Sequence, residues 1–208
     1  MASAEEGEAI QSPGILETIH LEHVPSTHTV HIGLFRDVTN ADFLQKQLLS
    51  RNSDFEYAFI DATSVVSRFQ ILAAVYKAII IQMSGNMKTP NVHSEIVCSL
   101  SPNKNISEAY RRFGITGTTN SLIIIKVLIT PPSTFTPTSV QQHLLAHVQG
   151  TPTPLTDEVL QSSLTDWAKV RKYYKLNGVN WLDSVEDETA KRAEMEVLVL
   201  EGMALRGL

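Results

Sequence analysis

The segment Leu122–Ile129 constrains the fold more than any other part of the sequence. It reads Leu-Ile-Ile-Ile-Lys-Val-Leu-Ile, so apolar side chains fall on both sides of an extended chain. A strand of this kind lies at the centre of a sheet and is covered on both faces. Lys126 is the one charged residue inside it. The rest of the chain therefore has to supply neighbouring strands and flanking helices.

Three further segments have the patterns of strands. Thr29–Phe35 alternates apolar with polar or small residues, which predicts a half-buried strand. Tyr57–Ile60 is a short apolar piece, predicted to be a strand or an extended connection. Ser94–Leu100 alternates as well and predicts a second clear strand. In that strand Cys98 would face the core and His93 the opposite side.

Helical spacing and capping residues predict the flanking helices. Asn40 can cap a helix over 41–49, and Asn105 or Ser107 can cap a short helix over 106–113 that Gly114 closes. Further helices are predicted over 138–147, 157–176 and 188–206.

The strongest helix signal covers residues 69–83 and ends at Gly85. One stripe of its apolar residues follows helical spacing, and these are Phe69, Leu72, Ala73, Tyr76, Ile80 and Met83. Ile71, Val75, Ala78 and Ile79 lie off that stripe and are apolar too. A helix that is apolar nearly all round is either central to the core or offers a second face to a partner.

The last helix also has two apolar stripes. The first contains Ala190, Ala193, Val197, Leu200 and Ala204, and Leu198 and Leu205 form its neighbour. Both this helix and helix 69–83 thus have more apolar residues than one core-facing stripe needs.

These elements predict an α/β (α+β) protein with one mixed β-sheet flanked by helices. A chain of 208 residues has room for one domain and one sizeable core. We expect a flexible leader over 1–26, a single domain over 27–208, and a proline-punctuated loop insert at 130–137.

Composition excludes several classes of protein. Hydrophobic residues make up 43% and charged residues 19%, which is ordinary for a globular protein and excludes a wholly disordered chain. One cysteine excludes a disulfide framework and a four-cysteine zinc site. The acidic N-terminus is not a secretory signal, and no apolar stretch is long enough to cross a membrane. A reducing, intracellular compartment is expected.

The net charge of −5 hides an uneven distribution along the chain. Residues 1–35 and residues 183–201 each sum to −5, whereas residues 36–182 sum to +4 and Arg206 adds one more. The body can therefore have a basic surface although the whole chain is acidic, or the mixed charges can be an ordinary solvated face.

No set of residues has the pattern of a catalytic or metal centre. His143 and His147 lie four apart on a predicted helix, but Leu144 stands where a metalloprotease has glutamate and no further ligand is nearby. Cys98 is expected to be a small core residue. The chain has no nucleophile elbow, and Gly114-Ile115-Thr116-Gly117 lacks the lysine of a P-loop. We expect no cofactor.

Two basic clusters remain. One contains Lys104, Arg111 and Arg112, and the other runs from Lys169 to Lys175 around Tyr173 and Tyr174. Basic residues interleaved with tyrosines can bind phosphates and stack on bases. The alternative is an ordinary solvated helix face with Tyr173 or Tyr174 in the core, and the pattern by itself favours this alternative.

One long run of residues resembles a known family. It is Leu100-Ser101-Pro102-Asn103-Lys104-Asn105-Ile106-Ser107-Glu108-Ala109, preceded by Met87-Lys88-Thr89 and followed by Arg112-Phe113-Gly114-Ile115. Together with Lys172-Tyr173-Tyr174-Lys175-Leu176 and the terminal Leu205-Arg206-Gly207, it is similar to the PRPK-binding protein (TPRKB) family, the fungal members above all. The resemblance covers roughly residues 28–208. Pro90 stands where the family has a basic residue.

The resemblance implies a non-enzymatic subunit of the KEOPS/EKC complex. Its direct partner would be the complex's small atypical kinase-ATPase, and its indirect partner the threonylcarbamoyl-transferase subunit that modifies tRNA beside the anticodon. Archaeal relatives also hold the 3′ CCA end of tRNA. The family further implies a place in the nucleus and cytoplasm and a link to telomere maintenance. No membrane partner is implied.

Two sets of residues are predicted to carry this function. The surplus apolar residues are the candidates for kinase binding, and these are Leu198, Leu205, Leu208, Val75 and Ile79. The basic candidates for tRNA binding are Lys77, Lys88, Lys104, Arg111, Arg112 and Arg206. A stand-alone RNA-binding module is the alternative. A thiol- or metal-dependent enzyme is a third, and it would require Cys98 for function.

Overall fold

A single antiparallel sheet forms the centre of the molecule. The computed structural model describes residues 15–131 and 135–206. The strands are β1 (Glu17–Ile19), β2 (His28–Arg36), β3 (Ala58–Asp61), β4 (Leu122–Ile129) and β5 (Thr151–Thr153). Their order is β1-β2-β4-β3, and β5 joins β2 on the same edge as β1. Every described pairing is antiparallel, so the prediction of a mixed sheet was wrong, whereas the α/β class is confirmed.

Strand β4 has the central place that its sequence predicts. It pairs with β2 over its whole length and with β3 over residues 122–125. Its side chains alternate between two apolar clusters, one on each face of the sheet. Ile123, Ile125 and Val127 belong to the larger cluster, and Leu122 and Ile124 to the smaller.

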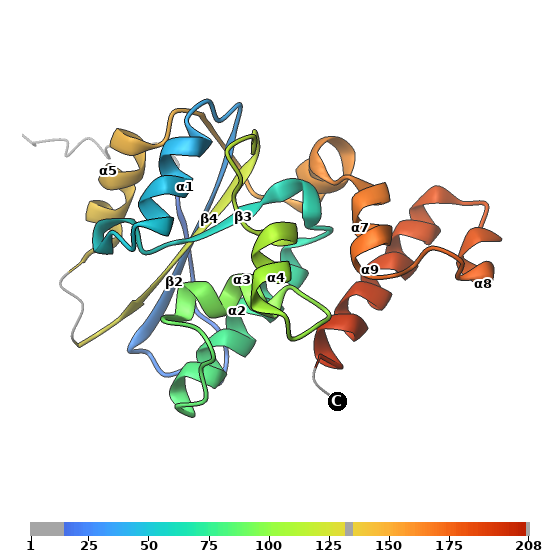
Figure 1. Ribbon diagram of the computed structural model, residues 1–208, viewed down its shortest axis with the longest axis horizontal. Coiled ribbons are helices and arrows are strands. Elements are labelled where there is room, and N and C mark those ends of the chain that lie inside the picture. The colour runs from blue at the N-terminus through green and yellow to red at the C-terminus, as the bar shows by residue number, and fades with distance from the viewer. Residues whose placement is uncertain (1–14, 132–134, 207–208) are drawn as a thin grey trace, which may run out of the picture.

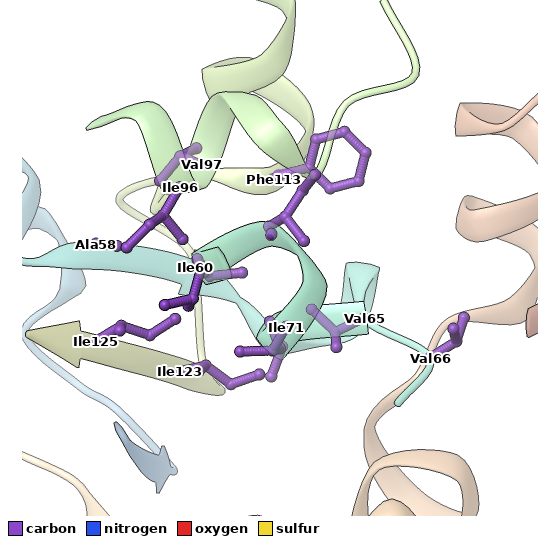
Figure 2. Close-up of a cluster of buried hydrophobic side chains, with 14 of the residues drawn as sticks. Ala58, Ile60, Val65, Val66, Ile71, Ile96, Val97, Phe113, Ile123 and Ile125 are labelled. Carbon is purple, nitrogen blue, oxygen red and sulfur yellow. The ribbon is translucent and has the colours of Figure 1, made fainter. Parts of the chain in front are cut away.

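Helices cover both faces of the sheet (Figure 1). On one side lie α1 (Ala41–Leu49) and α5 (Pro137–His147). On the other lie α2 (Arg68–Met83), α3 (Val92–Ser99) and α4 (Ile106–Phe113). Figure 2 shows the second side, where Ile71 of α2 lies beside Ile123 of β4, and Ile96 of α3 lies over Ala58 and Ile60 of β3.

The chain from residue 157 onward is helical and extends to one end of the molecule (Figure 1). It contains α6 (Asp157–Val159), a π-helical turn over Leu160–Leu164, α7 (Trp167–Tyr173), α8 (Asn180–Asp183) and α9 (Glu188–Ala204). The single helix predicted over 157–176 is thus broken. Asp166 interrupts it, because its carboxylate accepts a hydrogen bond from the Lys169 N–H and starts a new helix.

Helix α3 overturns the strand predicted over Ser94–Leu100. Asn91 caps the helix by accepting a hydrogen bond from the Ser94 N–H. Seven of its eight residues are buried, including the polar His93 and Glu95. The alternation of polar and apolar residues predicted a strand with one exposed face. In α3 polar and apolar residues are buried alike, so the alternation does not indicate which residues are exposed.

The ends of the predicted domain also differ from expectation. Residues 17–19 of the predicted leader form β1 and pair with β2, while residues 1–14 lie outside the described residues. Within the predicted insert, Pro137 is the first residue of α5, and Thr136 and Ser139 form its capping box. Residues 132–134 lie outside the described residues.

Candidate docking surface and basic groups

Helix α2 presents apolar side chains to solvent. Phe69, Tyr76, Ile80 and Met83 are 61%, 39%, 38% and 46% exposed. All four belong to the stripe with helical spacing, so that stripe faces outward. Lys77 is the only charged residue between Phe69 and Met83, which leaves this outer side with little polar character. Isolated apolar residues on a surface are common, but a continuous apolar helix face marks an interaction site.

The off-stripe residues of α2 form the core instead. Ile71, Val75, Ala78 and Ile79 are completely buried between the sheet and α3. Val75 and Ile79 were predicted to be exposed kinase-binding residues, and their burial corrects that prediction. The reason is that both sides of the helix are apolar, so periodicity gives two stripes without saying which one faces the sheet.

Helix α9 turns to the core a side that neither predicted stripe contains. Met195, Val199 and Met203 face the core, whereas Val197 of the first predicted stripe is half exposed. Leu205, just beyond the helix, is 59% exposed. Leu198 is partly buried and packs against the core. Leu208 lies outside the described residues.

The two helices are joined at their C-terminal halves. Lys77 of α2 donates a hydrogen bond of 2.7 Å from Nζ to the backbone oxygen of Met203 in α9. We use the term α2/α9 surface for the exposed apolar residues of this pair, which are Phe69, Tyr76, Ile80, Met83, Val197 and Leu205.

Three of the predicted tRNA-binding residues gather near the end of α9. Arg206 donates from Nε to the backbone oxygen of Asn103, next to the exposed Lys104. Burial, followed by the nearby charge of Arg206, lowers the pKa of Lys77. Lys77 therefore joins α2 to α9, and Arg206 joins the end of α9 to the loop before α4. Lys104 is exposed, whereas the side chains of Lys77 and Arg206 are partly buried.

Arg111 and Arg112 share one carboxylate, that of Glu108 on the same helix. Arg111 binds both carboxylate oxygens, at 2.9 and 2.7 Å, and Arg112 binds one of them. These hydrogen bonds, that of Arg111 first, lower the pKa of Glu108 to about 2. Arg112 also donates to the backbone oxygen of Tyr173 and lies over its ring, so it ties α4 to α7. Arg111 keeps most of its side chain in solvent.

A cleft of about 570 Å³ opens beside Arg111. Its walls come from the end of α1, the loop before β3, the start of α3 and the end of α4, and they include Leu48, Phe55, Asn91, Tyr110 and Arg111. Lys88 is exposed two residues before Pro90 at the rim. The buried Glu95 holds this loop by accepting hydrogen bonds from the Thr89 hydroxyl and the Lys88 N–H. Sequence periodicity gave no signal for this cleft, because its residues come from four separate segments.

Part of the second basic cluster has structural partners, whereas Lys172 and Lys175 are exposed. Lys169 binds Asp61 and Thr63, and Arg171 pairs with Asp183. Tyr174 is buried, donates from its hydroxyl to the Leu100 backbone oxygen, and accepts a hydrogen bond from Gln70. This confirms that a tyrosine of the cluster lies in the core.

The residues considered for catalysis have ordinary structural roles. Cys98 is buried, and burial raises the pKa of its thiol to about 11, which is unfavourable for a nucleophile. Among residues 15–131 and 135–206, no three histidine, cysteine or acidic side chains are placed to hold a metal ion. No helix in the same ranges is long and apolar enough to cross a membrane.

Sequence comparisons place this fold among known proteins. Residues 35–207 match the family described as kinase binding protein CGI-121. The EKC/KEOPS complex subunit cgi121 of Neurospora crassa is 52% identical over 206 residues, covering 93% of this chain and 99% of the relative. The corresponding subunit of Gibberella zeae is also 52% identical, with the same coverage. That of Schizosaccharomyces pombe is 31% identical and covers 86% of this chain and 93% of the relative.

An antiparallel α/β domain that exposes apolar helix faces has the character of a protein-binding domain. The match over most of the chain makes the identification specific: this protein belongs to the CGI-121 family of kinase binding proteins.

Proposed function

We propose that this chain is a non-catalytic subunit of an EKC/KEOPS complex that binds and activates the atypical kinase-ATPase of that complex. In this role it supports formation of threonylcarbamoyl-adenosine in tRNA, in the nucleus and the cytoplasm. The names of the family and of the fungal relatives support the kinase partner and the complex. The observation that carries the proposal is the apolar outer side of α2.

The α2/α9 surface is the site where we propose that the kinase docks. Specific interfaces bury on the order of 1,600 Å² and depend on a few apolar or aromatic anchors at their centre. Phe69, Tyr76 and Ile80 supply such anchors on one rigid helix. Leu205 extends the surface just beyond α9, and its exposure leaves it a candidate for kinase binding.

Replacing Ile80 with glutamate tests this site. The new charge would have to be desolvated at the interface, so the kinase should bind at least ~30-fold more weakly, as at an interface hot spot. Titration calorimetry with the purified kinase subunit measures the loss. Leu205→Glu should weaken binding in the same direction.

The matched control is Leu145→Glu. Leu145 is 54% exposed on α5, which covers the opposite face of the sheet. This variant should bind the kinase like the wild type, and circular dichroism should show all three variants folded. Normal binding by Ile80→Glu, or loss of binding in Leu145→Glu, would move the docking site elsewhere.

We further propose that the rim of the cleft contacts tRNA at its 3′ CCA end. Arg111 and Lys88 supply positive charge beside apolar and aromatic walls, a combination that suits a phosphate followed by an unpaired base. Lys77, Lys104 and Arg206 place further positive charge at the C-terminal end of α9 and in the loop before α4.

Salt dependence distinguishes tRNA binding from kinase docking. Binding of intact tRNA should weaken with salt at a logarithmic slope of roughly −0.7 per neutralised phosphate of the single strand, whereas apolar docking should barely respond. A tRNA lacking CCA should bind more weakly than intact tRNA. The double variant Lys88→Gln/Arg111→Gln should remove that difference, and the exposed Lys172→Gln on α7 should retain it.

Equal binding of both tRNAs by the wild type would reject the CCA contact while leaving kinase docking unaffected.

Activation of the kinase is tested by a separate measurement. ATP hydrolysis by the kinase, and tRNA modification by the reconstituted complex, should both rise on addition of the wild type and not on addition of Ile80→Glu. A stand-alone RNA-binding module would show salt-dependent tRNA binding without any effect on the kinase.

A further inference from the structure

Two histidine rings lie against each other on α5. His143 and His147 are four residues apart, and their ring centroids are 4.3 Å apart at an interplanar angle of 31°. Phe55 presses against both rings, with centroid distances of 4.8 and 5.2 Å. The buried Phe55 thus holds the two imidazoles on one side of α5. Helix α5 itself lies next to α1 (Figure 1).

Each ring is oriented by a hydrogen bond at Nδ1. His147 Nδ1 lies 2.8 Å from the backbone oxygen of His143, which can only accept, so this nitrogen carries the proton. The neutral ring then has its lone pair on Nε2. His143 Nδ1 lies 2.9 Å from the Tyr57 hydroxyl, whose oxygen can accept the proton of that ring in the same way. Histidines that bind metals are held by this second hydrogen bond in most metal sites.

The charges around the pair are mixed. Asp54 acts electrostatically on both His143 and Tyr57. Lys126 is also near His143, but its ammonium group donates to the Glu56 backbone oxygen and lies over the Tyr57 ring. The carboxylate of Asp54 therefore opposes the charge of Lys126 at this place.

We propose that His143 and His147 bind one divalent cation of the zinc type through their two Nε2 atoms, with water as the remaining ligands. Neutral imidazole is a preferred ligand of Zn²⁺, and an i, i+4 pair places two rings on one face of a helix. Since no third protein ligand is in place among the described residues, the site is open and exchanges its metal. The sequence pattern argued against this pair because it lacks the glutamate and third ligand of a metalloprotease. The structure adds the orientation of both rings.

Titration of the untagged, full-length chain with Zn²⁺ alone, followed by calorimetry in a buffer that does not chelate metals, tests the site. The wild type should bind one Zn²⁺ per chain. His147→Ala should bind at least ~10-fold more weakly, because one of two ligands is gone. Tyr57→Phe removes the hydrogen bond that orients His143 and should weaken binding by about tenfold.

The chain contains its own control pair. His20 and His23 are both exposed and lie three residues apart, His20 directly after β1 and His23 in the turn that follows. The double variant His20→Ala/His23→Ala should bind Zn²⁺ like the wild type. Unchanged binding in His147→Ala, or loss of binding in the control, would overturn the proposal. The measurement uses the chain alone, so its outcome is independent of the kinase and of tRNA.

Discussion

The imidazole of His93 accepts a hydrogen bond from the part of β4 that has no pairing with β3. β3 pairs with β4 only as far as Ile125, and the Val127 N–H beyond it donates to Nε2 of the buried His93 at 3.0 Å. Burial, followed by the nearby charge of Lys126, lowers the pKa of His93 from 6.5 to about 3. The ring is therefore neutral in the folded protein at every pH between those values.

Acid should weaken the fold through this residue. The unfolded chain takes up a proton at His93 below about pH 6.5 and the folded chain does not, so the free energy of unfolding falls as pH drops from 6.5 toward 3. Between pH 7 and pH 5 the contribution of His93 is about 2 kcal/mol. In His93→Gln the amide oxygen can still accept from Val127, and this part of the pH dependence should vanish. Urea unfolding at the two pH values measures it, and an unchanged difference would show that His93 is not the titrating group.

The buried hydroxyl of Tyr174 also joins two elements by hydrogen bonds. Its hydroxyl joins Leu100 at the end of α3 to Gln70 of α2. Tyr174→Phe leaves the Leu100 oxygen and the Gln70 amide without this partner, which should lower the free energy of unfolding by about 1–3 kcal/mol. Tyr76→Phe, on the exposed side of α2, should change it by less than ~0.5 kcal/mol. Equal effects in chemical denaturation would contradict the assignment of Tyr174 to the core network.

At the scale of the element, α2 offers a direct comparison of its two apolar sides. Ile79 is completely buried and its neighbour Ile80 is 38% exposed. Ile79→Ala should cost about 2–5 kcal/mol of stability, because it removes packed methyl groups and leaves a cavity. Ile80→Ala should cost well under 1 kcal/mol but should weaken kinase binding. Reversed effects in denaturation would mean that the helix is rotated relative to the structure.

The elements also show what periodicity can and cannot predict. The strand Leu122–Ile129 and the helix Ile106–Phe113 begin and end where the sequence predicts, because the first is apolar throughout and Asn105 caps the second. The α3 prediction failed because the helix is buried on nearly all sides. In α2 both sides are apolar, so which of them faces the core depends on tertiary packing. In α9 the core-facing residues Met195, Val199 and Met203 belong to neither predicted stripe. The cleft beside Arg111 depends on contacts between segments far apart in sequence, and no local pattern predicts it.

At the scale of the whole molecule, contacts cross the sheet-to-helix boundary at several points. Lys169 of α7 binds Asp61 at the end of β3, and Arg68 at the start of α2 binds Glu17 of β1 and the backbone oxygen of Leu155. The larger apolar cluster includes Val170 and Val199 together with residues of β2 and β4. The C-terminal helices therefore share one core with the sheet.

Unfolding should accordingly be a single cooperative event. Trp167 and Trp181 both report on residues 157–206, whereas far-ultraviolet circular dichroism reports on all helices. The two signals should change at the same urea concentration, as in two-state unfolding of a single domain. An earlier fluorescence transition would show that residues 157–206 unfold separately. That result would also replace the single domain expected over 27–208 with two units.

The apolar outer side of α2 has a consequence for the amount of this protein in a cell. Quality-control chaperones and proteases act on exposed apolar surface. With the kinase docked on α2 as proposed, a free copy would offer them a substrate and a bound copy would not. Copies made in excess would be cleared first. The steady-state level of the chain would then follow the level of its partner, and matched amounts of the two subunits would be reached after translation, without any coupling of their genes.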